Sequence, residues 1–322
     1  MNHAIRVHEH GGPEKLVWEE VPLPDPKPGE VLVRHHAVGL NYIDVYFRTG
    51  LYKAPSMPVT VGMEGAGVIE AVGDGVTDLK VGDRVAYAGA LGAYAEARCA
   101  PADRLVKLPE GIDFTQGASM MLQGMTAQFL VKRTYAIKPG DTILVHAAAG
   151  GVGSIVVQWA KHIGATVIGV VSTPEKAALI TSLGADHALL TSENIPARVR
   201  EITNGAMLPV VYDSVGKDTF LTSLDCLQPF GLMISYGNAS GPVTTDLGVL
   251  AAKGSLYVTR PTLNTYTAKR SDLVATANDL FEVVKSGAVK IHVNQNFALK
   301  DAAEGHRALE SRSTTGSTVF IP

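Results

Sequence analysis

The sequence predicts an α/β protein with two domains, and three observations support this fold class. Its 322 residues are enough for two domains of roughly 100–200 residues each. Up to about Gly124, Gly and Pro break the chain into short extended runs, a pattern typical of antiparallel β structure. From about Met125 to Pro261, apolar strands alternate with helical stretches, as in βαβ units around a parallel sheet. We therefore expect a β domain over residues 1–124 and a doubly wound domain over residues 125–261.

The expected β domain consists of short strands, and this half of the chain shows no helical period. The segment Pro22–Pro28 contains four prolines and indicates an irregular link between two strands. The strands are expected at Ala4–Val7, Leu16–Val21, Val31–Val38, Gly67–Val72, Arg84–Tyr87 and Tyr94–Cys99.

The second domain is expected to contain a six-stranded parallel sheet with helices between its strands. Gly184 follows one helical stretch directly and is a suitable residue to end a helix. The strands are expected at Thr142–His146, Thr166–Val171, Ala188–Leu190, Val210–Asp213, Leu232–Tyr236 and Ser255–Thr259. The helices are expected at Gly151–Ile163, Pro174–Leu183, Ile195–Thr203 and Thr219–Leu227.

The C-terminal segment predicts two more helices, near Ser271–Ser286 and Lys300–Ser311, and a final strand at Thr318–Ile321. Because an isolated strand is not stable, we expect residues 262–322 to return to the β domain and complete it. The doubly wound domain is then an insertion, and a cleft between the two domains is the expected place for a ligand.

The most informative motif is the turn His146–Gly153, which follows an apolar strand and opens an apolar-periodic helix. A helix N-terminus offers free N–H groups to an anion, and glycine lets a pyrophosphate approach the backbone. Ala148 stands where the first glycine of G-x-G-x-x-G is usual, so the strand and helix around the turn support the prediction more than the motif itself. The turn predicts a dinucleotide site.

The second strand of this unit lacks the acidic residue that usually binds the ribose of NAD. Ser172 stands there, 19 residues after Gly153, and leaves room for a 2′-phosphate. Lys176 lies four residues further on and is a candidate cation for that phosphate. Two interpretations of Lys176 stay open, a phosphate ligand and an ordinary solvated lysine.

Composition excludes several classes of partner. A formal charge of −3, a pI near 6.4 and the lack of a dense basic cluster argue against nucleic acid as the main partner. Cys99 and Cys226 are far apart in sequence and fit neither a disulfide framework nor a zinc site, which favours a reducing compartment. No secretory signal or long uncharged apolar run is evident, so we expect a cytoplasmic protein without a membrane partner.

Seven motifs occur in order along nearly the whole chain: Gly11–Glu14, Gly39–Asp44, Gly62–Gly67, Val81–Val85, Ala148–Gly153, Val211–Gly216 and Gly254–Pro261. With them the chain resembles the zinc-free quinone oxidoreductases of the medium-chain dehydrogenase/reductase superfamily, close to the bacterial NADPH:quinone reductases and the ζ-crystallins. The resemblance implies a GroES-like antiparallel β domain joined to a doubly wound Rossmann domain.

Alcohol dehydrogenases of this superfamily hold a catalytic zinc, and two of its ligand positions correspond here to Asn41 and Met63. An amide and a thioether are poor zinc ligands, because Zn²⁺ takes thiolate, imidazole or carboxylate. The four-cysteine structural zinc lobe is also absent from the sequence. Glu64 remains from the family's Gly-x-Glu, and we interpret it as structural. We therefore expect no metal.

Without a Lewis acid, the substrate should be one whose reduction needs little help, and quinones fit because their reduction gives an aromatic product. The resemblance implies that Asn41 and Tyr42 contact NADPH and that Tyr46 and Tyr52 face the substrate. Tyrosine can stack on a quinone ring and donate a hydrogen bond to its oxygen. The alternative for Tyr46 and Tyr52 is simple packing at a domain interface. The candidate catalytic residues are Asn41, Tyr46 and Tyr52.

The remaining cofactor contacts are also implied by the resemblance. Thr191 stands where relatives often have an aromatic residue near the adenine. Strand Ser255–Thr259 is apolar and at the edge of the sheet, and family members form homodimers there. The expected ligands of NADPH are Asn41, Tyr42, Gly150, Gly151, Val152, Gly153, Ser172, Lys176, Ser214, Gly237, Asn238 and Arg260.

Two other functions stay open. The same metal-free cleft would suit reduction of an activated C=C bond, so an NADPH-dependent alkenal/enone reductase is the second enzyme hypothesis. A protein that binds or senses NADPH without turnover is the third, and turnover with quinones, with enones or with neither separates the three.

Overall fold

The computed structural model describes residues 1–311 and 313–322, and it divides into two compact units. Unit 1 comprises Met1–Met125, Thr267–Lys285 and Ile291–Pro322, and unit 2 comprises Thr126–Tyr266 and Ser286–Lys290. The assignment of residues 262–322 to the β domain therefore differs from the structure in two short segments. Tyr266 stacks on Phe129 with ring centroids 4.4 Å apart, which holds residues 262–266 in unit 2. The main chain of Lys290 exchanges two hydrogen bonds with the Gln158 side chain, which holds residues 286–290 there.

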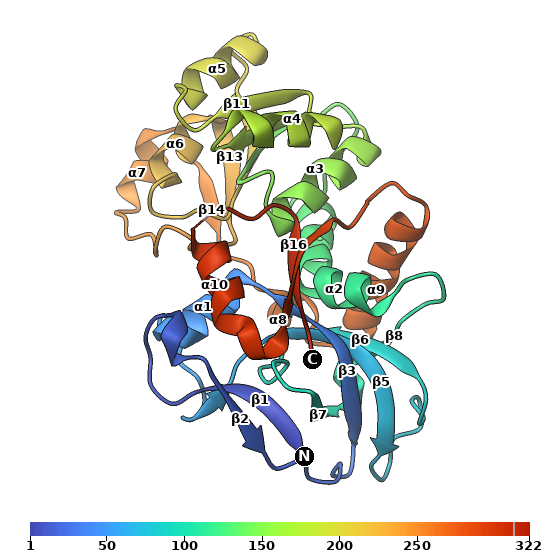
Figure 1. The fold of residues 1–322 in the computed structure, drawn as a ribbon. Coiled ribbons are helices and arrows are strands. Elements are labelled where there is room, and N and C mark those ends of the chain that lie inside the picture. The colour runs from blue at the N-terminus through green and yellow to red at the C-terminus, as the bar shows by residue number, and fades with distance from the viewer. Residues whose placement is uncertain (312) are drawn as a thin grey trace. The chain divides into compact units, whose positions relative to one another are not determined.

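Unit 1 contains two β-sheets, and the predicted antiparallel architecture is confirmed for its central strands (Figure 1). Strand β3 pairs antiparallel with β5, β7 and β16. Among the described residues of unit 1, the one parallel pair of strands is β15 with β16. The smaller sheet has the order β2-β1-β4, with β1 Asn2–Val7, β2 Val17–Val21 and β4 Val59–Thr60. The larger sheet has the order β15-β16-β3-β5-β6-β8, with β15 Val293–Ala298, β16 Ser317–Ile321, β3 Glu30–Leu40, β5 Glu64–Val72, β6 Arg84–Ala88, β8 Val106–Lys107, and β7 Ala97–Pro101 paired to β3.

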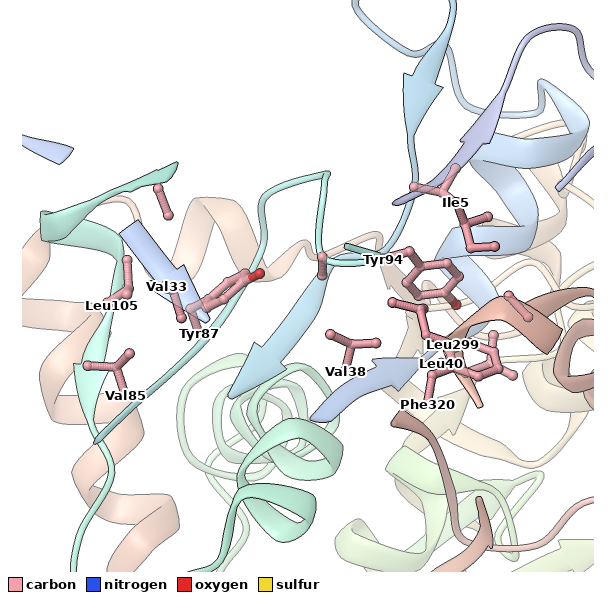
Figure 2. Close-up of a cluster of buried hydrophobic side chains, with 14 of the residues drawn as sticks. Ile5, Val33, Val38, Leu40, Val85, Tyr87, Tyr94, Leu105, Leu299 and Phe320 are labelled. Atoms are coloured by element: carbon pink, nitrogen blue, oxygen red, sulfur yellow. The ribbon is translucent and has the colours of Figure 1, made fainter. Parts of the chain in front are cut away.

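The core of unit 1 combines residues from both ends of the chain. Figure 2 shows Leu40 of β3 and Phe320 of β16 beside Tyr94, together with Leu299, which lies just before α10. The rings of Tyr94 and Phe320 meet edge to face, with centroids 5.0 Å apart. The tail thus supplies part of the core on which β3 rests.

Two helices that begin in unit 1 were not expected, because this half of the sequence shows no helical period. Helix α1, Tyr42–Thr49, has only eight residues and ends at Gly50, whose φ of 83° is left-handed. Helix α2, Phe114–Phe129, is buried along almost its whole length from Gly117, so it lacks the polar face that makes a helix visible in sequence. A Cβ at its Gly124 would lie 2.5 Å from Leu280 of α9, Arg270–Lys285. Because α2 packs closely on several sides, its sequence lacks the alternation of polar and apolar faces that indicates a helix.

The other helices of unit 1 belong to the tail and to short connections. The predicted helix near Lys300–Ser311 is α10, Ala302–Glu310, preceded by a 3₁₀ turn at Leu299–Asp301. Two further 3₁₀ turns lie at Pro13–Lys15 and Ala102–Arg104.

Unit 2 contains the predicted six-stranded parallel sheet, in the order β11-β10-β9-β12-β13-β14. This doubly wound order places β9 and β12 side by side, with Ile143 opposite Val210. The strands are β9 Thr142–His146, β10 Thr166–Val171, β11 His187–Leu190, β12 Leu208–Asp213, β13 Leu227–Ser235 and β14 Tyr257–Thr259. The helices are α3 Gly151–Ile163, α4 Pro174–Ser182, α5 Ile195–Ile202, α6 Phe220–Asp225, α7 Gly248–Ala252 and α8 Leu263–Tyr266, with a π-helical turn at Leu130–Thr134 after α2.

One edge of the sheet is shorter than expected. The strand predicted over Ser255–Thr259 begins only at Tyr257, because Gly254 and Ser255 have left-handed φ values of 113° and 55°. A chain in that conformation cannot continue a sheet. Strand β14 therefore contributes three residues, all paired with β13.

Candidate functional site

The turn between β9 and α3 brings the predicted phosphate-binding residues together at the carboxyl end of the central strand. Gly150 is the N-cap of α3, and its N–H donates to Ala147 O at 2.9 Å. A Cβ on Gly153 would lie 2.4 Å from the same carbonyl oxygen, so only glycine permits this approach of helix to strand. The N–H groups at the start of α3 are thereby held at one place, which is where a phosphate binds in this fold.

Ala148, which replaces the usual first glycine, is accommodated by the neighbouring strand. Gly169 in β10 lies opposite Val145 of β9, and a Cβ on Gly169 would lie 3.0 Å from the Ala148 methyl group and 2.4 Å from Ile180 Cδ1. The missing side chain at Gly169 therefore makes room for the extra methyl at Ala148. The sequence contains this signal, but only the strand pairing reveals it.

Ser172 and Lys176 both lie just beyond the carboxyl end of β10, the strand beside β9. Ser172 is exposed, and Thr173 caps α4 by accepting the N–H of Lys176 at 3.3 Å. Thr191 is exposed after β11, and its N–H donates to Val171 O at 2.9 Å. The structure thus gathers the predicted 2′-phosphate pair and the adenine-side residue Thr191 at neighbouring strand ends.

The loops after β12 and β13 hold Ser214, Gly237 and Asn238 close together. A Cβ on Gly237 would lie 2.2 Å from Ser214 O, so the two loops touch through their main chains. Arg260 follows β14 and donates to Ser235 O at 2.8 Å. With the Asn238 amide oriented to satisfy its hydrogen bonds, its oxygen accepts from Arg260 at 3.0 Å.

Asp213 is a residue of this region that the sequence analysis did not single out. Its carboxylate is fully buried and accepts four hydrogen bonds. One oxygen accepts from the N–H groups of Val215 at 2.8 Å and Gly216 at 3.0 Å, and the other from the hydroxyls of Thr219 and Ser223, both at 2.7 Å. Asp213 therefore fixes the loop that carries Ser214.

In unit 1, the side chain of Asn41 lies in a buried chain of hydrogen bonds. Its Nδ2 donates to Glu64 Oε2 at 2.7 Å, and its Oδ1 accepts from Gln123 Nε2 at 3.0 Å. Glu64 Oε1 accepts the N–H of Leu122 at 2.8 Å. Burial raises the pKa of Glu64 to about 8, against the lowering effect of these hydrogen bonds. Glu64 was expected to be structural, and Gln123 was not predicted as part of the site.

A second buried chain holds the main chain at Asn41. The N–H of Asn41 donates to Asp44 Oδ2 at 2.9 Å, and the Tyr94 hydroxyl donates to the same oxygen at 3.0 Å. His306 Nε2 lies 3.2 Å from that hydroxyl, and His306 Nδ1 lies 2.9 Å from Arg48 Nη1. Because a guanidinium can only donate, Nδ1 accepts, and the imidazole proton sits on Nε2. Each hydrogen bond in this series is therefore donated in one direction, from Arg48 towards Asp44.

Burial sets the protonation of this second chain. It raises the pKa of Asp44 to about 7, and together with the Arg48 charge it lowers the pKa of His306 to about 3. Arg48 is 1% exposed and forms a two-pronged ion pair with Glu310 at 2.8 and 2.9 Å. The chain as a whole joins α1, the loop before β7 and α10 through Arg48, His306, Tyr94 and Asp44. Asp44 lies in the motif Gly39–Asp44, but none of the four was predicted as a site residue.

The three predicted tyrosines lie on or just after α1 and form an aromatic group. The rings of Tyr46 and Tyr52 meet edge to face, with centroids 5.1 Å apart, and those of Tyr42 and Tyr46 are 6.3 Å apart. The Tyr42 hydroxyl donates to Leu309 O at 3.2 Å. Tyr46 is buried at 9% exposure, whereas Tyr52 is half-buried.

The described residues contain neither a cluster of metal ligands nor a helix suited to a membrane. In residues 1–311 and 313–322, no three His, Cys, Asp or Glu side chains gather as a metal site would require. Within the same residues, every helix is too short or too polar to cross a membrane.

Comparison with known proteins gives consistent matches along the whole chain. Residues 27–110 match the alcohol dehydrogenase GroES-like domain, and residues 151–279 match the zinc-binding dehydrogenase family. A quinone oxidoreductase of Pseudomonas aeruginosa is 53% identical over 100% of both chains. The crystal structure of Escherichia coli quinone oxidoreductase complexed with NADPH has 48% identity and a TM-score of 0.98 over 99% of this chain and 100% of that one. A 2-haloacrylate reductase of Burkholderia is 46% identical over 99% of this chain and 98% of its own.

Proposed function

Because the chain belongs to the quinone oxidoreductase family of the medium-chain dehydrogenases/reductases, we propose that it is an NADPH-dependent quinone reductase. The observation that carries this proposal is the 53% identity, over the full length of both chains, to a quinone oxidoreductase. We propose that it acts without a metal, because Asn41 and Met63 occupy the positions of two zinc ligands and neither side chain is a good donor to zinc.

The residues of unit 2 fit a dinucleotide. The close approach at Gly153 and the contact between Gly237 and Ser214 O leave backbone, rather than side chains, at the strand ends. We propose that Gly150, Gly151, Val152 and Gly153 bind the pyrophosphate, and that Ser172 and Lys176 bind the 2′-phosphate. Ser214, Gly237, Asn238 and Arg260 would hold the rest of the cofactor at the ends of β12, β13 and β14.

NADPH, when bound, supplies a hydride, and the protein has to orient the quinone and stabilise the charge that develops on its oxygen. We propose that Asn41 and Tyr42 contact the cofactor and that Asn41, Tyr46 and Tyr52 act on the substrate. A tyrosine hydroxyl or the Asn41 amide N–H can donate to a developing oxyanion. The buried chains around Asn41 support this role, because they hold it in place before substrate binds.

The test is steady-state NADPH oxidation with 1,4-benzoquinone or a naphthoquinone as acceptor. We expect saturable turnover that Tyr52→Phe reduces through kcat more than through KM, because the lost hydrogen bond forms in the transition state. The similarity to 2-haloacrylate reductase favours reduction of an activated C=C bond as the second candidate function. Faster turnover of 2-chloroacrylate or a short enone than of any quinone would replace the first proposal by the second, and no turnover with either would favour a protein that only binds NADPH.

Lys176 provides the test of cofactor choice. We expect the parent protein to bind NADPH more tightly than NADH, and Lys176→Ala to narrow this gap by about 1–2 kcal/mol by removing a charge-assisted contact. The affinity for NADH should stay unchanged, which is the internal control. Equal affinities of the parent protein for the two cofactors would contradict the assignment of both Ser172 and Lys176.

We propose that the protein is a homodimer and that it is located in a reducing compartment, the cytoplasm. The support for the homodimer is strand β14, in which Tyr257 and Val258 are 60% and 38% exposed although both are apolar strand residues. An uncovered apolar edge favours pairing with a second copy of the chain. Val258→Lys should therefore yield monomers in sedimentation equilibrium. Both cysteines are free thiols, as a reducing compartment maintains them.

A further inference from the structure

The side chain of Asn41 lies in the middle of a chain of hydrogen bonds that crosses four elements of unit 1. Ser317 at the start of β16 donates to Gln123 Oε1 at 2.7 Å, and Gln123 in α2 donates to Asn41 Oδ1 at 3.0 Å. Asn41, the N-cap of α1, donates to Glu64 Oε2 in β5 at 2.7 Å. These four residues are at most 6% exposed. Water therefore does not compete for their hydrogen bonds, and the direction of each bond depends on its neighbours.

In the observed direction, Glu64 only accepts. Its Oε2 accepts from Asn41, and its Oε1 accepts the N–H of Leu122 at 2.8 Å. This arrangement suits an ionised carboxylate. A proton on Oε1 would face the N–H of Leu122, which is another donor. A proton on Oε2 would face the Asn41 amide, which can present its oxygen as an acceptor by turning over.

The whole chain of hydrogen bonds can reverse if the amide groups of Asn41 and Gln123 turn over, so that each exchanges its nitrogen and oxygen. A protonated Glu64 donates to the Asn41 oxygen, the Asn41 NH₂ group donates to the Gln123 oxygen, and the Gln123 NH₂ group donates to Ser317 Oγ. The Ser317 hydroxyl then donates to Ser119 O, which already lies 3.2 Å away. Every donor again meets an acceptor. The two directions differ only in the proton on Glu64 and in the orientation of two amide groups.

We propose that Glu64, Gln123 and Ser317 are positioning residues that hold the Asn41 amide in one of two orientations, and that the proton on Glu64 selects between them. Reversal exchanges the positions of the amide N–H groups and the carbonyl oxygen of Asn41. The N–H and the oxygen lone pair that do not bind Glu64 or Gln123 therefore exchange places as well. The consequence for catalysis rests on the proposed function, in which Asn41 contacts cofactor and substrate.

The groups around Glu64 leave both of its protonation states accessible. Burial raises its pKa to about 8. Asp44 in α1 opposes its ionisation, and burial raises the pKa of Tyr87 in β6 and of Tyr94 before β7, so both phenols remain neutral. Burial lowers the pKa of His35 in β3 to about 4, and α2 presents only uncharged groups to Glu64. Asp44 is therefore the neighbour whose charge is coupled to that of Glu64.

The first experiment follows the amide itself, not turnover. In protein labelled with ¹⁵N in Asn side chains and ¹³C in Glu carboxyls, the Asn41 NH₂ signal is identified by its loss in Asn41→Ser. We expect this signal and the Glu64 carboxyl signal to shift together in one pH transition. Glu64→Gln should abolish the transition and leave the Asn41 signal at its low-pH position, because the NH₂ group of the introduced glutamine donates to Asn41 Oδ1 as the protonated acid does. Glu70→Gln makes the same change in the same strand at an exposed pair with Arg34 and should leave the transition unaltered.

The proposal is overturned if the Asn41 NH₂ signal does not shift in the Glu64 transition, or if it stays at its high-pH position in Glu64→Gln. If Glu64→Gln does not fold, Gln123→Glu gives the same test. Its carboxylate can only accept from Asn41, which favours the reversed direction and should move the Glu64 transition upward by one pH unit or more. An unmoved transition there also contradicts the proposal. Gln116→Glu, the same change near the start of α2, is the control, because its side chain accepts only the Asp113 N–H.

The second experiment separates this inference from the proposed function. The pH profile of kcat with NADPH and benzoquinone should contain the same transition in the parent protein and lack it in Glu64→Gln. If quinone turnover is absent at every pH while the NMR transition is present, the proposed function fails and the positioning role stands. If turnover is normal and the NMR transition is absent, the positioning role fails and the function stands.

Discussion

The candidate site of unit 1 is held by side chains, whereas the candidate site of unit 2 is shaped by the main chain. In unit 1, Asn41 is held by buried side chains, through Glu64 and Gln123 on its amide and through Asp44 on its N–H. In unit 2, the strand ends are shaped by missing side chains, since a Cβ on Gly153 or Gly237 would lie 2.4 or 2.2 Å from a carbonyl oxygen. A site made of titratable side chains depends on charge and pH. A site made of main chain depends on shape.

The buried chains of unit 1 also differ from each other in a useful way. The one that ends on Asp44 starts at Arg48, which cannot accept a hydrogen bond, so its direction is fixed. The one that ends on Glu64 starts at Ser317, a hydroxyl that can donate or accept. One therefore anchors the main chain of Asn41 in a single direction, and the other can reverse when Glu64 gains or loses a proton.

The largest expected effect comes from removing the fixed end of the first chain. Arg48→Met should lower the free energy of unfolding by about 3–5 kcal/mol, because it leaves His306 Nδ1 and Gly11 O without their buried donor and breaks the pair with Glu310. Urea unfolding followed by Trp18 in unit 1 measures this loss. The control is Arg34→Met, which breaks an exposed pair with Glu70 and should cost at most about 1 kcal/mol. Equal losses in the two variants would contradict the importance of burial here.

The second prediction tests the shape of the site in unit 2. Gly153→Ala should weaken NADPH binding about tenfold or more, because the methyl group displaces the Ala147 carbonyl at a cost of about 1–3 kcal/mol. Calorimetric titration with NADPH measures the change, which should not vary between pH 6.5 and 8. Gly248→Ala, also in the first turn of a helix of unit 2, meets only the flexible Asp246 side chain and is the control. Unchanged affinity in Gly153→Ala would show that the turn does not contact the cofactor.

The smallest expected effect is the change with pH in the free energy of unfolding of unit 1. Asp44 and Glu64 have pKa values raised to about 7 and about 8, so the folded protein holds protons that the unfolded chain has already lost. Stability from these groups is present at low pH and is lost as pH rises through 7 and 8. His306 and His35, lowered to about 3 and about 4, act in the opposite sense only below about pH 6.5.

We therefore expect the free energy of unfolding of unit 1 to fall by roughly 1–2 kcal/mol between pH 6.5 and 8. Urea unfolding at these two pH values measures the fall, and Asp44→Asn should reduce it because an amide does not ionise. Trp159, buried in unit 2, reports the second unit as a comparison. A rise in stability over this interval would contradict the buried protonated carboxyls.

Much of unit 2 could be predicted from its sequence, whereas much of the site in unit 1 could not. The strand–turn–helix signal of β9 and α3 is local, and the expected bounds of both elements match those of the structure. Helix α1 was missed because it has only eight residues, and because Asp44, the third helical residue in its capping box, also binds Tyr94, which is distant in sequence. Gln123 was missed because α2 is buried around most of its surface and shows no polar face.

The sequence by itself determined the α/β class, the six-stranded parallel sheet, the glycine turn and the residue types at the strand ends, because each depends on periodicity or on a turn of a few residues. Only the tertiary structure decided which side chains surround Asn41. Glu64 lies 23 residues from Asn41, Gln123 lies 82 residues away, and Arg48 pairs with Glu310 across 262 residues. No local pattern encodes such contacts, and burial, which sets the pKa values of Glu64 and Asp44, exists only after the strands and helices have packed.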